Sequence, residues 1–244
     1  MMAAQHFPLL SQSGAKATIT LNRPEHHNRI DPEDIPIIHA HLDAIEADAS
    51  IHMVVITGTG YKTFSSGYTL DAILTRMDDS FQLMLGRLET FAKPTVCALN
   101  GSAYGGGVDL ASCCDFRIGV HGSRMFVPAA KFGLHYHPDG IRRFVQRVGP
   151  VAAKKVFMLG KTLHAEEMLR VGFLTDLVAP TDLDATIDEY LESVRAGSTS
   201  VMSSIKQNID AFAGGAWDST QWVKRYHSTL QSEEIMQRLE KLRG

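Results

Sequence analysis

Short apolar runs alternate with amphipathic stretches along the first 180 residues. The apolar runs are rich in β-branched residues and predict strands, which fall at Ala17–Leu21, Met53–Thr57, Thr95–Leu99, Phe116–Ile118 and Asp176–Val178. Apolar residues at helical spacing predict a helix that begins at Asp31. They predict further helices at Ser80–Phe91, Val108–Cys114, Val151–Leu159 and Ala165–Val171. This alternation is typical of an α/β fold.

The pattern becomes helical almost throughout after Pro180. Its apolar positions predict helices at Leu183–Arg195, Ser200–Ala213 and Trp217–Leu242. We therefore expect two domains, a strand-bearing core over residues 1–185 and a helical region over residues 186–244.

Composition narrows the class of protein. A chain of 244 residues with 44% hydrophobic residues can bury a substantial core. Its net charge of −3 argues against a nucleic-acid partner, which needs a basic stripe. Three cysteines do not form a disulfide framework. Without a signal-peptide pattern or an apolar run of membrane-spanning length, we expect a cytoplasmic protein that binds no membrane.

Two glycine-containing turns carry the most informative chemistry. Gly105 to Gly107 precede a predicted helix and leave backbone N–H groups uncovered by side chains. Gly67 precedes a second helical stretch and leaves the N–H of Tyr68 free in the same way. Two such groups that converge on one carbonyl oxygen would stabilise an enolate or a tetrahedral oxyanion. A turn that only packs against a neighbouring helix is the alternative.

Several segments follow one another in a recognisable order over most of the chain. They are Ile19–Glu25 with Asn28, Val54–Gly58, Phe64–Tyr68, Lys93–Gly107, Cys114–Ile118, Ala165–Met168 and Val171–Leu174. In order and spacing this set resembles the crotonase (enoyl-CoA hydratase/isomerase) family. The resemblance implies a ββα spiral core that binds acyl-CoA and a C-terminal helical trimerisation region, with a homotrimer or a dimer of trimers as the assembly. Coenzyme A is then part of the substrate, and no separate cofactor is expected.

The resemblance also assigns residues to the site. The N–H groups of Tyr68 and Gly106 would form the oxyanion hole around the thioester carbonyl. The stretches from Arg23 to Arg29 and from Ser66 to Leu70 would line the coenzyme A path. The implied substrate-binding residues are Arg23, Ser66, Gly67, Thr69, Leu70 and Gly105.

Two positions depart from the hydratases of this family, which handle water with two glutamates. The first position holds Asp109, an acid shorter by one methylene, and the second holds Ala129, which cannot transfer a proton. A lost acid/base group is typically worth a factor of about 10² to 10⁴ in rate. We expect Asp109 to be a catalytic acid or base, and a charge that only stabilises a helix start is the alternative.

The segment after Ala129 supplies two more candidate catalytic residues. Around Tyr136 it resembles the methylmalonyl-CoA decarboxylases locally, so Tyr136 is a candidate proton donor or substrate-orienting residue, or else a tyrosine satisfied at a pocket edge. His137 can shuttle protons near neutral pH, or else is a surface histidine. His135 and His137 have no third ligand at suitable spacing, so no metal site is expected.

These features predict an enzyme that acts on an acyl-CoA thioester through an enolate. By the resemblance it is a lyase of the enoyl-CoA hydratase kind or an isomerase, and Ala129 leaves the specific reaction open. The alternatives are a decarboxylase or a β-diketone hydrolase of the same fold, or a scaffold that binds acyl-CoA without catalysis.

Overall fold

A six-stranded sheet forms the centre of the fold. The computed structural model describes residues 6–75 and 78–243. The strands lie in the order β1-β2-β3-β5-β7-β10, and all are parallel to their neighbours except β1, which is antiparallel to β2. Their bounds are β1 Leu9–Ser13, β2 Lys16–Leu21, β3 Met53–Gly58, β5 Thr95–Leu99, β7 Phe116–Val120 and β10 Asp176–Val178. The five strands predicted from apolar runs are all present, and β1 was not predicted.

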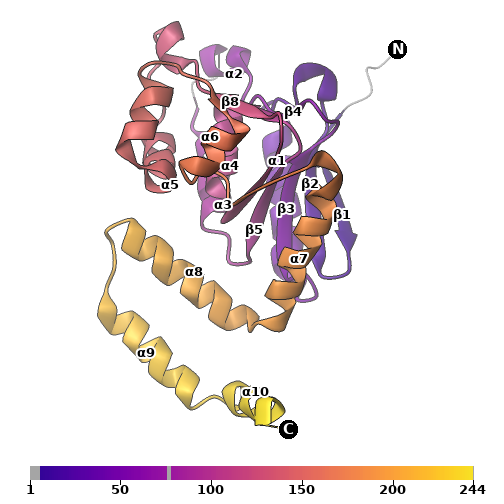
Figure 1. Cartoon of the computed structure of the whole chain (residues 1–244), viewed down its shortest axis with the longest axis vertical. Coiled ribbons are helices and arrows are strands. Elements are labelled where there is room, and N and C mark those ends of the chain that lie inside the picture. Colours follow the sequence, from indigo (N-terminus) through magenta and orange to yellow (C-terminus); the bar gives the residue numbers. More distant parts are fainter. Residues whose placement is uncertain (1–5, 76–77, 244) are drawn as a thin grey trace. The chain divides into compact units, whose positions relative to one another are not determined.

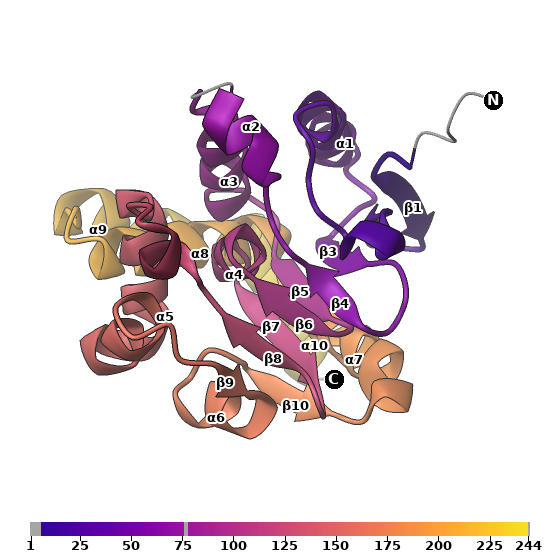
Figure 2. The same ribbon diagram turned by 90° about the horizontal axis from the view of Figure 1, so that it is seen from above.

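A second sheet of short strands accompanies the first, as Figure 2 shows from above. It has the order β4-β6-β8-β9, with β4 Thr63–Ser65, β6 Ser102–Tyr104, β8 Arg124–Phe126 and β9 Leu163–His164. The chain passes three times from the large sheet to the small one and then into helical structure, through β3-β4, β5-β6 and β7-β8. This repetition is the expected ββα spiral. Strands of two or three residues have too few apolar positions to predict the second sheet from sequence.

Both faces of the large sheet are buried at its central strands β3 and β5. Along β3, Val54 and Ile56 belong to one apolar cluster, whereas Met53 and Val55 belong to another. The second cluster is completed by Leu183, Ile187, Leu191 and Val194 of α7 (Leu183–Ala196), which covers that face in Figure 1. Continuous rather than alternating apolar runs are typical of parallel strands buried on both sides.

The remaining helices follow the expected order with shifted bounds. They are α1 Asp34–Ala47, α2 Leu70–Thr75, α3 Ser80–Glu89, α4 Gly106–Cys113, α5 Pro138–Phe157, α6 Ala165–Arg170, α8 Thr199–Ala213, α9 Ser219–Leu230 and α10 Glu233–Arg243. Short 3-10 turns occur at Pro24–His26, Ala129–Phe132 and Pro180–Asp182. No described helix is both long and apolar enough to cross a membrane.

Three helix predictions need correction. The first helix begins at Asp34 rather than Asp31, because this start leaves Pro36 in the first turn, where no N–H is required. Helix α5 begins thirteen residues before the predicted Val151 and bends at Gly149, whose φ is 73°.

The predicted helix Trp217–Leu242 is two helices, α9 and α10. The hydroxyl of Ser232 accepts a hydrogen bond from the N–H of Ile235 (3.4 Å). A serine hydroxyl that accepts from an N–H three residues later caps the start of a helix. The predicted helix is therefore interrupted between Leu230 and Glu233. The chain divides into two compact units, residues 1–203 and residues 204–244.

Candidate active site

The two glycine-containing turns lie at the same edge of the small sheet. Gly67 follows β4 and Gly105 follows β6, and these strands are parallel neighbours. The carboxyl ends of parallel neighbours meet at one edge, so the turns are brought together by the pairing of the strands. Each turn is separated from the longer strand before it, β3 or β5, by one short strand of the small sheet.

Close packing of glycine backbones joins the turns. Gly67 has a φ of 80°, and a side-chain carbon there would lie 2.4 Å from Cα of Gly106. A side-chain carbon at Gly107 would lie 2.2 Å from the carbonyl oxygen of Ser65. Both distances are shorter than any non-bonded contact, so only glycine fits at these two positions.

The backbone around Tyr68 turns its N–H toward the site. Ile30 forms a parallel bridge with Tyr68, in which the N–H of Ile30 donates to Gly67 O and the N–H of Thr69 donates to Ile30 O. Because N–H groups alternate direction along an extended segment, the N–H of Tyr68 points away from Ile30. Among the described turn and loop hydrogen bonds, none uses this N–H.

The N–H of Gly106 is the second candidate donor. Gly106 is the first residue of α4, where backbone N–H groups have no partner within the helix. A side-chain carbon at Gly106 would lie 3.1 Å from the nitrogen of Tyr68. The two candidate donors therefore lie beside each other at the positive end of a helix dipole, as an oxyanion hole requires.

Two cavities meet at these donors. The smaller has a volume of about 270 Å³ and contains Asp109, so we name it the Asp109 cavity; the larger, of about 610 Å³, contains Arg29 and is the Arg29 cavity. Both are lined by Tyr68, Ile73, Gly106, Leu134 and Tyr136. A thioester whose carbonyl lies at the shared wall would extend its acyl group into one cavity and its thiol group into the other.

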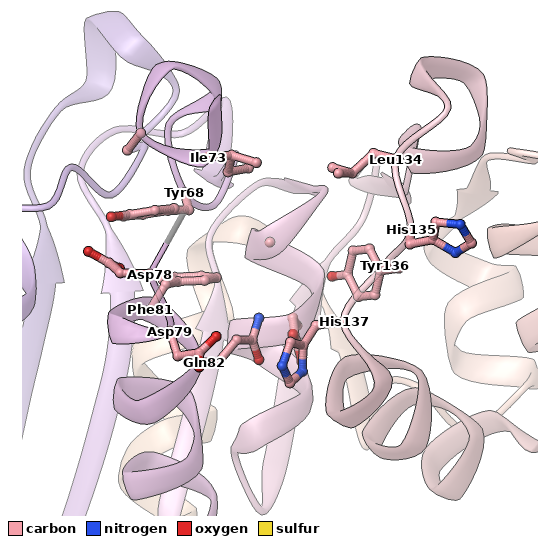
Figure 3. Close-up of a pocket in the computed structure, with 13 residues that line it drawn as sticks. Tyr68, Ile73, Asp78, Asp79, Phe81, Gln82, Leu134, His135, Tyr136 and His137 are labelled. Atoms are coloured by element: carbon pink, nitrogen blue, oxygen red, sulfur yellow. The ribbon is translucent and has the colours of Figure 1, made fainter. Parts of the chain in front are cut away.

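The walls of the Asp109 cavity differ in character (Figure 3). On one side the rings of Tyr68 and Phe81 are stacked, with centroids 4.9 Å apart. On the opposite side Tyr136 and Leu134 project inward, whereas the ring of His135 is turned away from Tyr136. An apolar acyl chain fits between such walls.

Asp109 is the buried acid of the Asp109 cavity, whereas Asp78 and Asp79, which also line it, are exposed. It is only 2% exposed, and it lies in the first turn of α4, one helical turn after the donor Gly106. Its Oδ1 lies 3.1 Å from Nη1 of Arg143, whereas its Oδ2 is buried and has no hydrogen-bond partner among the described residues. Burial raises the pKa of the Asp109 carboxyl, and the charge of Arg143 offsets part of that rise. One oxygen is thus held by Arg143, while the other is buried beside Gly140 without a hydrogen-bond partner among the described residues.

Arg143 links Asp109 to a second carboxylate. Its Nε donates to Oε2 of Glu89 (2.8 Å), and Arg142 donates to both oxygens of Glu89. Burial acts to raise the pKa of Glu89, but the hydrogen bonds from Arg142 and Arg143 outweigh it and lower that pKa. Glu89 therefore stays ionised and holds Arg143 against Asp109.

Tyr136 and His137 both reach the Asp109 cavity, but other bonds occupy them. The hydroxyl of Tyr136 donates to the carbonyl oxygen of Gly105 (3.1 Å). Burial raises the pKa of this hydroxyl well above its ordinary value. Nδ1 of His137 accepts from the N–H of Asp139 (3.2 Å) and so caps α5, which leaves its Nε2 for other partners.

The predicted substrate-binding residues divide into two groups. Ser66, Thr69 and Gly105 line the Arg29 cavity, and Gly67 forms the turn beneath it. Arg23 lines neither cavity, because its guanidinium pairs with Asp31 and Asp34. Leu70 begins α2, and its side chain lies outside the described part of the structure.

Sequence reasoning missed Phe81 and Arg143, and it did not single out Arg29. Arg29 lies in a segment assigned to coenzyme A, but nothing separated it from Arg23. Phe81 belongs to the apolar stripe of α3 and gave no other signal. Arg143 is 2% exposed, and its contact with Asp109 joins residues 34 positions apart, a distance that sequence pattern does not bridge.

The wall around Ala129 is apolar. Ala129 is buried and lines the Arg29 cavity together with Phe126, Val127, Pro128, Phe132 and Leu134. No acid therefore faces the donors from the position where the resemblance places a second glutamate. Within the described residues, no three histidine, cysteine or acidic side chains are grouped so that they could hold a metal ion.

Comparison with known proteins gives a consistent result. The family model described as "Enoyl-CoA hydratase/isomerase" matches residues 12–241. The short-chain-enoyl-CoA hydratase of Clostridium acetobutylicum is 28% identical over 83% of this chain and 80% of its own length. The crotonyl-CoA hydratase of Syntrophomonas wolfei is 30% identical over 72% of this chain and 70% of its own. A solved enoyl-CoA hydratase/carnithine racemase from Magnetospirillum magneticum has the same fold, with a TM-score of 0.90 at 24% identity over 98% of this chain and 93% of that one.

Proposed function

The chain belongs to the enoyl-CoA hydratase/isomerase family, and from that premise we propose that it forms a thioester enolate from an acyl-CoA, with Asp109 as the group that moves the proton. One observation carries the proposal: Tyr68 and Gly106, whose N–H groups are the candidate donors, line one cavity together with Asp109, whose Oδ2 has no hydrogen-bond partner among the described residues. Two donors polarise the carbonyl, and a carboxylate beside them can take or give the proton at the neighbouring carbon.

The proposed binding mode follows from the two cavities. The acyl group lies in the Asp109 cavity, because proton transfer requires its α-carbon to be near the carboxylate. The thiol end then passes through the Arg29 cavity, where Arg29, which also pairs with Asp31 (2.9 Å), supplies a cation suited to the phosphates of coenzyme A. Coenzyme A is part of the substrate, and the proposal requires no further cofactor.

Hydration is the first candidate reaction, because the relatives named above are enoyl-CoA hydratases. Water would add to the β-carbon of an α,β-unsaturated acyl-CoA while the π electrons move to the carbonyl oxygen. The enolate then takes a proton at the α-carbon. Asp109 would be the single carboxylate for both proton transfers, and the reverse reaction would be dehydration.

The apolar wall around Ala129 favours a second candidate, decarboxylation. A carboxyl group on the α-carbon would leave as CO₂, and the electrons of the broken bond would move to the carbonyl oxygen. The resulting enolate would take one proton from protonated Asp109. This reaction needs no activated water, so a second acid is not required.

Exchange of α-protons tests the step common to both candidates. The enzyme is incubated with butyryl-CoA in D₂O, and the α-methylene signal is followed by proton NMR. We expect loss of that signal with the native enzyme and a rate lower by about 10² to 10⁴ with Asp109→Asn. Asp139→Asn, a change at the exposed start of α5, is the matched control and should exchange normally.

Product analysis then separates the reactions. Crotonyl-, methylmalonyl- and β-ketoacyl-CoA are offered, and mass spectrometry detects water addition, CO₂ loss or cleavage. Binding of butyryl-CoA without exchange, and without turnover of any of the three, would contradict the enzyme proposal and favour a binding scaffold. Cleavage of a β-diketone without any coenzyme A binding would instead indicate a hydrolase.

The assembly is part of the same proposal. Helix α8 exposes Ile205, Ile209 and Phe212 at helical spacing. Exposed apolar stripes of this kind are typical of contact surfaces. We take the homotrimer, or a dimer of trimers, as the assembly and the cytoplasm as its location.

A further inference from the structure

The hydroxyl of Tyr136 is bonded to the glycine turn itself. It lies 3.1 Å from the carbonyl oxygen of Gly105. A carbonyl oxygen can only accept, so the phenol donates, and its one proton is engaged in this bond. A tyrosine in this state is a poor proton donor to a substrate in the neighbouring cavity.

Gly105 is held from two other directions. The N–H of Val108 donates to the same carbonyl oxygen (3.1 Å), and the N–H of Gly105 donates to the carbonyl oxygen of Phe126 on β8 (3.0 Å). Gly105 has φ 49° and ψ −121°, a conformation that only glycine adopts without strain. The three bonds stabilise this one orientation of the turn.

The carbonyl of Gly105 and the N–H of Gly106 belong to one peptide unit. That unit is planar and trans, so its C=O and N–H point in opposite directions. Fixing the oxygen of Gly105 therefore fixes the direction of the N–H of Gly106. A hydrogen bond to the oxygen also polarises the unit and strengthens its N–H as a donor.

We infer that Tyr136 is a positioning residue, which aims and strengthens the Gly106 N–H through the carbonyl of Gly105. The inference rests on the proposed function, since it assigns Tyr136 a role in the proposed oxyanion hole. It replaces direct proton transfer by Tyr136 with polarisation of the substrate carbonyl through the peptide.

The ring of Tyr136 is held in place for this role. It packs against Phe157, with ring centroids 4.8 Å apart, and it reaches into the Asp109 cavity in Figure 3. A side-chain carbon at Gly140 would lie 2.5 Å from Cε1 of this ring, so glycine at the start of α5 makes room for it. Removing the hydroxyl leaves both contacts intact, and Tyr136→Phe therefore tests the hydrogen bond alone.

The experiment reads the carbonyl directly. Butyryl-CoA labelled with ¹³C at the thioester carbonyl is bound to the native enzyme, and its ¹³C chemical shift and C=O stretching frequency are compared with those of the free thioester. We expect a downfield shift and a lowered frequency on binding. Tyr136→Phe should reduce both changes, lower kcat about tenfold, and leave KM and the pH profile unchanged.

A matched control removes a tyrosine hydroxyl elsewhere. The hydroxyl of Tyr190 donates to Asp176, away from both cavities, so Tyr190→Phe should polarise the carbonyl as the native enzyme does.

The outcomes are distinguishable. Native-like polarisation with Tyr136→Phe overturns the inference while leaving the proposed function intact. Loss of an inflexion from the pH profile also overturns it, because direct proton transfer would then be shown. Absence of carbonyl polarisation in the native enzyme would contradict the proposed oxyanion hole, and with it the role of Tyr136.

Discussion

A side-chain carbon on Gly67 would lie 2.4 Å from Cα of Gly106. Gly67 directly precedes Tyr68, which carries one proposed donor, and Gly106 carries the other. The two turns are therefore in contact through their backbones. Gly67→Ala must push the turns apart, and losing one donor is expected to lower kcat about 10²- to 10³-fold. Steady-state kinetics with the panel of thioesters measures the change.

The matched control for Gly67 is Gly122. Its φ of 81° is nearly that of Gly67, but nothing lies within 4 Å of a side-chain carbon there. Gly122→Ala therefore carries the same backbone strain without the collision. Equal kinetics for the two variants would mean that contact between the turns does not matter for activity.

The pH dependence of activity should report Asp109. The pKa of the Asp109 carboxyl is raised, so this group becomes protonated at a pH above its ordinary pKa of 3.8. When Asp109 accepts a proton, kcat/KM falls as the pH decreases through that raised pKa. Arg143→Met removes the nearby cation, so we expect the fall to move to higher pH.

Arg143→Lys is the control for this displacement, because it keeps the charge while losing the forked geometry. The profile of kcat/KM against pH is measured for all three proteins. An inflexion at the same pH in each of them would show that a group other than Asp109 titrates.

Glu89 should contribute to stability in a pH-dependent way. Its pKa is lowered in the folded protein, so its contribution is complete above the pKa of the unfolded chain and is lost as the pH falls through the folded value. Glu89→Gln leaves Arg143 with an incomplete set of partners, and we expect a loss of about 3 kcal/mol at pH 7. The difference from the native protein should shrink in acid.

Urea unfolding at a series of pH values measures this loss. Glu192→Gln serves as the control, because Glu192 pairs with Arg195 on the exposed surface and should matter little. A constant difference between Glu89→Gln and the native protein down to pH 3 would refute the account of Glu89.

An acid introduced at position 129 should favour hydration. Ala129 lines the Arg29 cavity, which shares the wall of Gly106 and Tyr136 with the Asp109 cavity, and Ala129→Glu would place a second carboxylate near that wall for handling water. We expect turnover of crotonyl-CoA to rise at least about tenfold. Ala130→Glu, on an exposed neighbouring position, is the control. Unchanged hydration in a folded Ala129→Glu variant would show that the second acid does not limit the reaction.

The proposed assembly can be tested on α8. Replacing Ile209 and Phe212 by serine removes two exposed apolar side chains that have no role in the site. Analytical ultracentrifugation should show a trimer or hexamer for the native protein and smaller species for the double variant. Asp210→Ser, on the same helix, should leave the assembly unchanged. A native protein that sediments as a monomer would contradict the proposed trimer or hexamer.

Sequence predicted the centre of the large sheet well, because β3 and β5 are apolar on both faces, whereas the exposed edge strand β1 was not predicted. Val54 and Val55 bury their side chains on opposite sides, and both belong to one β-branched run. The small sheet was not predicted, since Ser102 and Tyr104 have no apolar periodicity and are ordered by pairing with β4 and β8.

For the site, the sequence predicted the two glycine turns but not the residues that contact them. The clash between Gly67 and Gly106 exists only once the two strands pair. Likewise, the bond from Tyr136 to Gly105 joins residues 31 positions apart, and the buried partner of Asp109 is farther still. Long-range contacts of this kind depend on tertiary packing rather than on local pattern.

The proposed donors are main-chain atoms, which every residue possesses whatever its side chain. The small sheet holds them by pairing of its own backbone, so lining residues other than Tyr136 can be exchanged without displacing the donors. An alanine at position 129 is then a change in the lining that leaves the donors in place. Redesign for a new reaction should begin with such lining residues and keep the glycines and Tyr136.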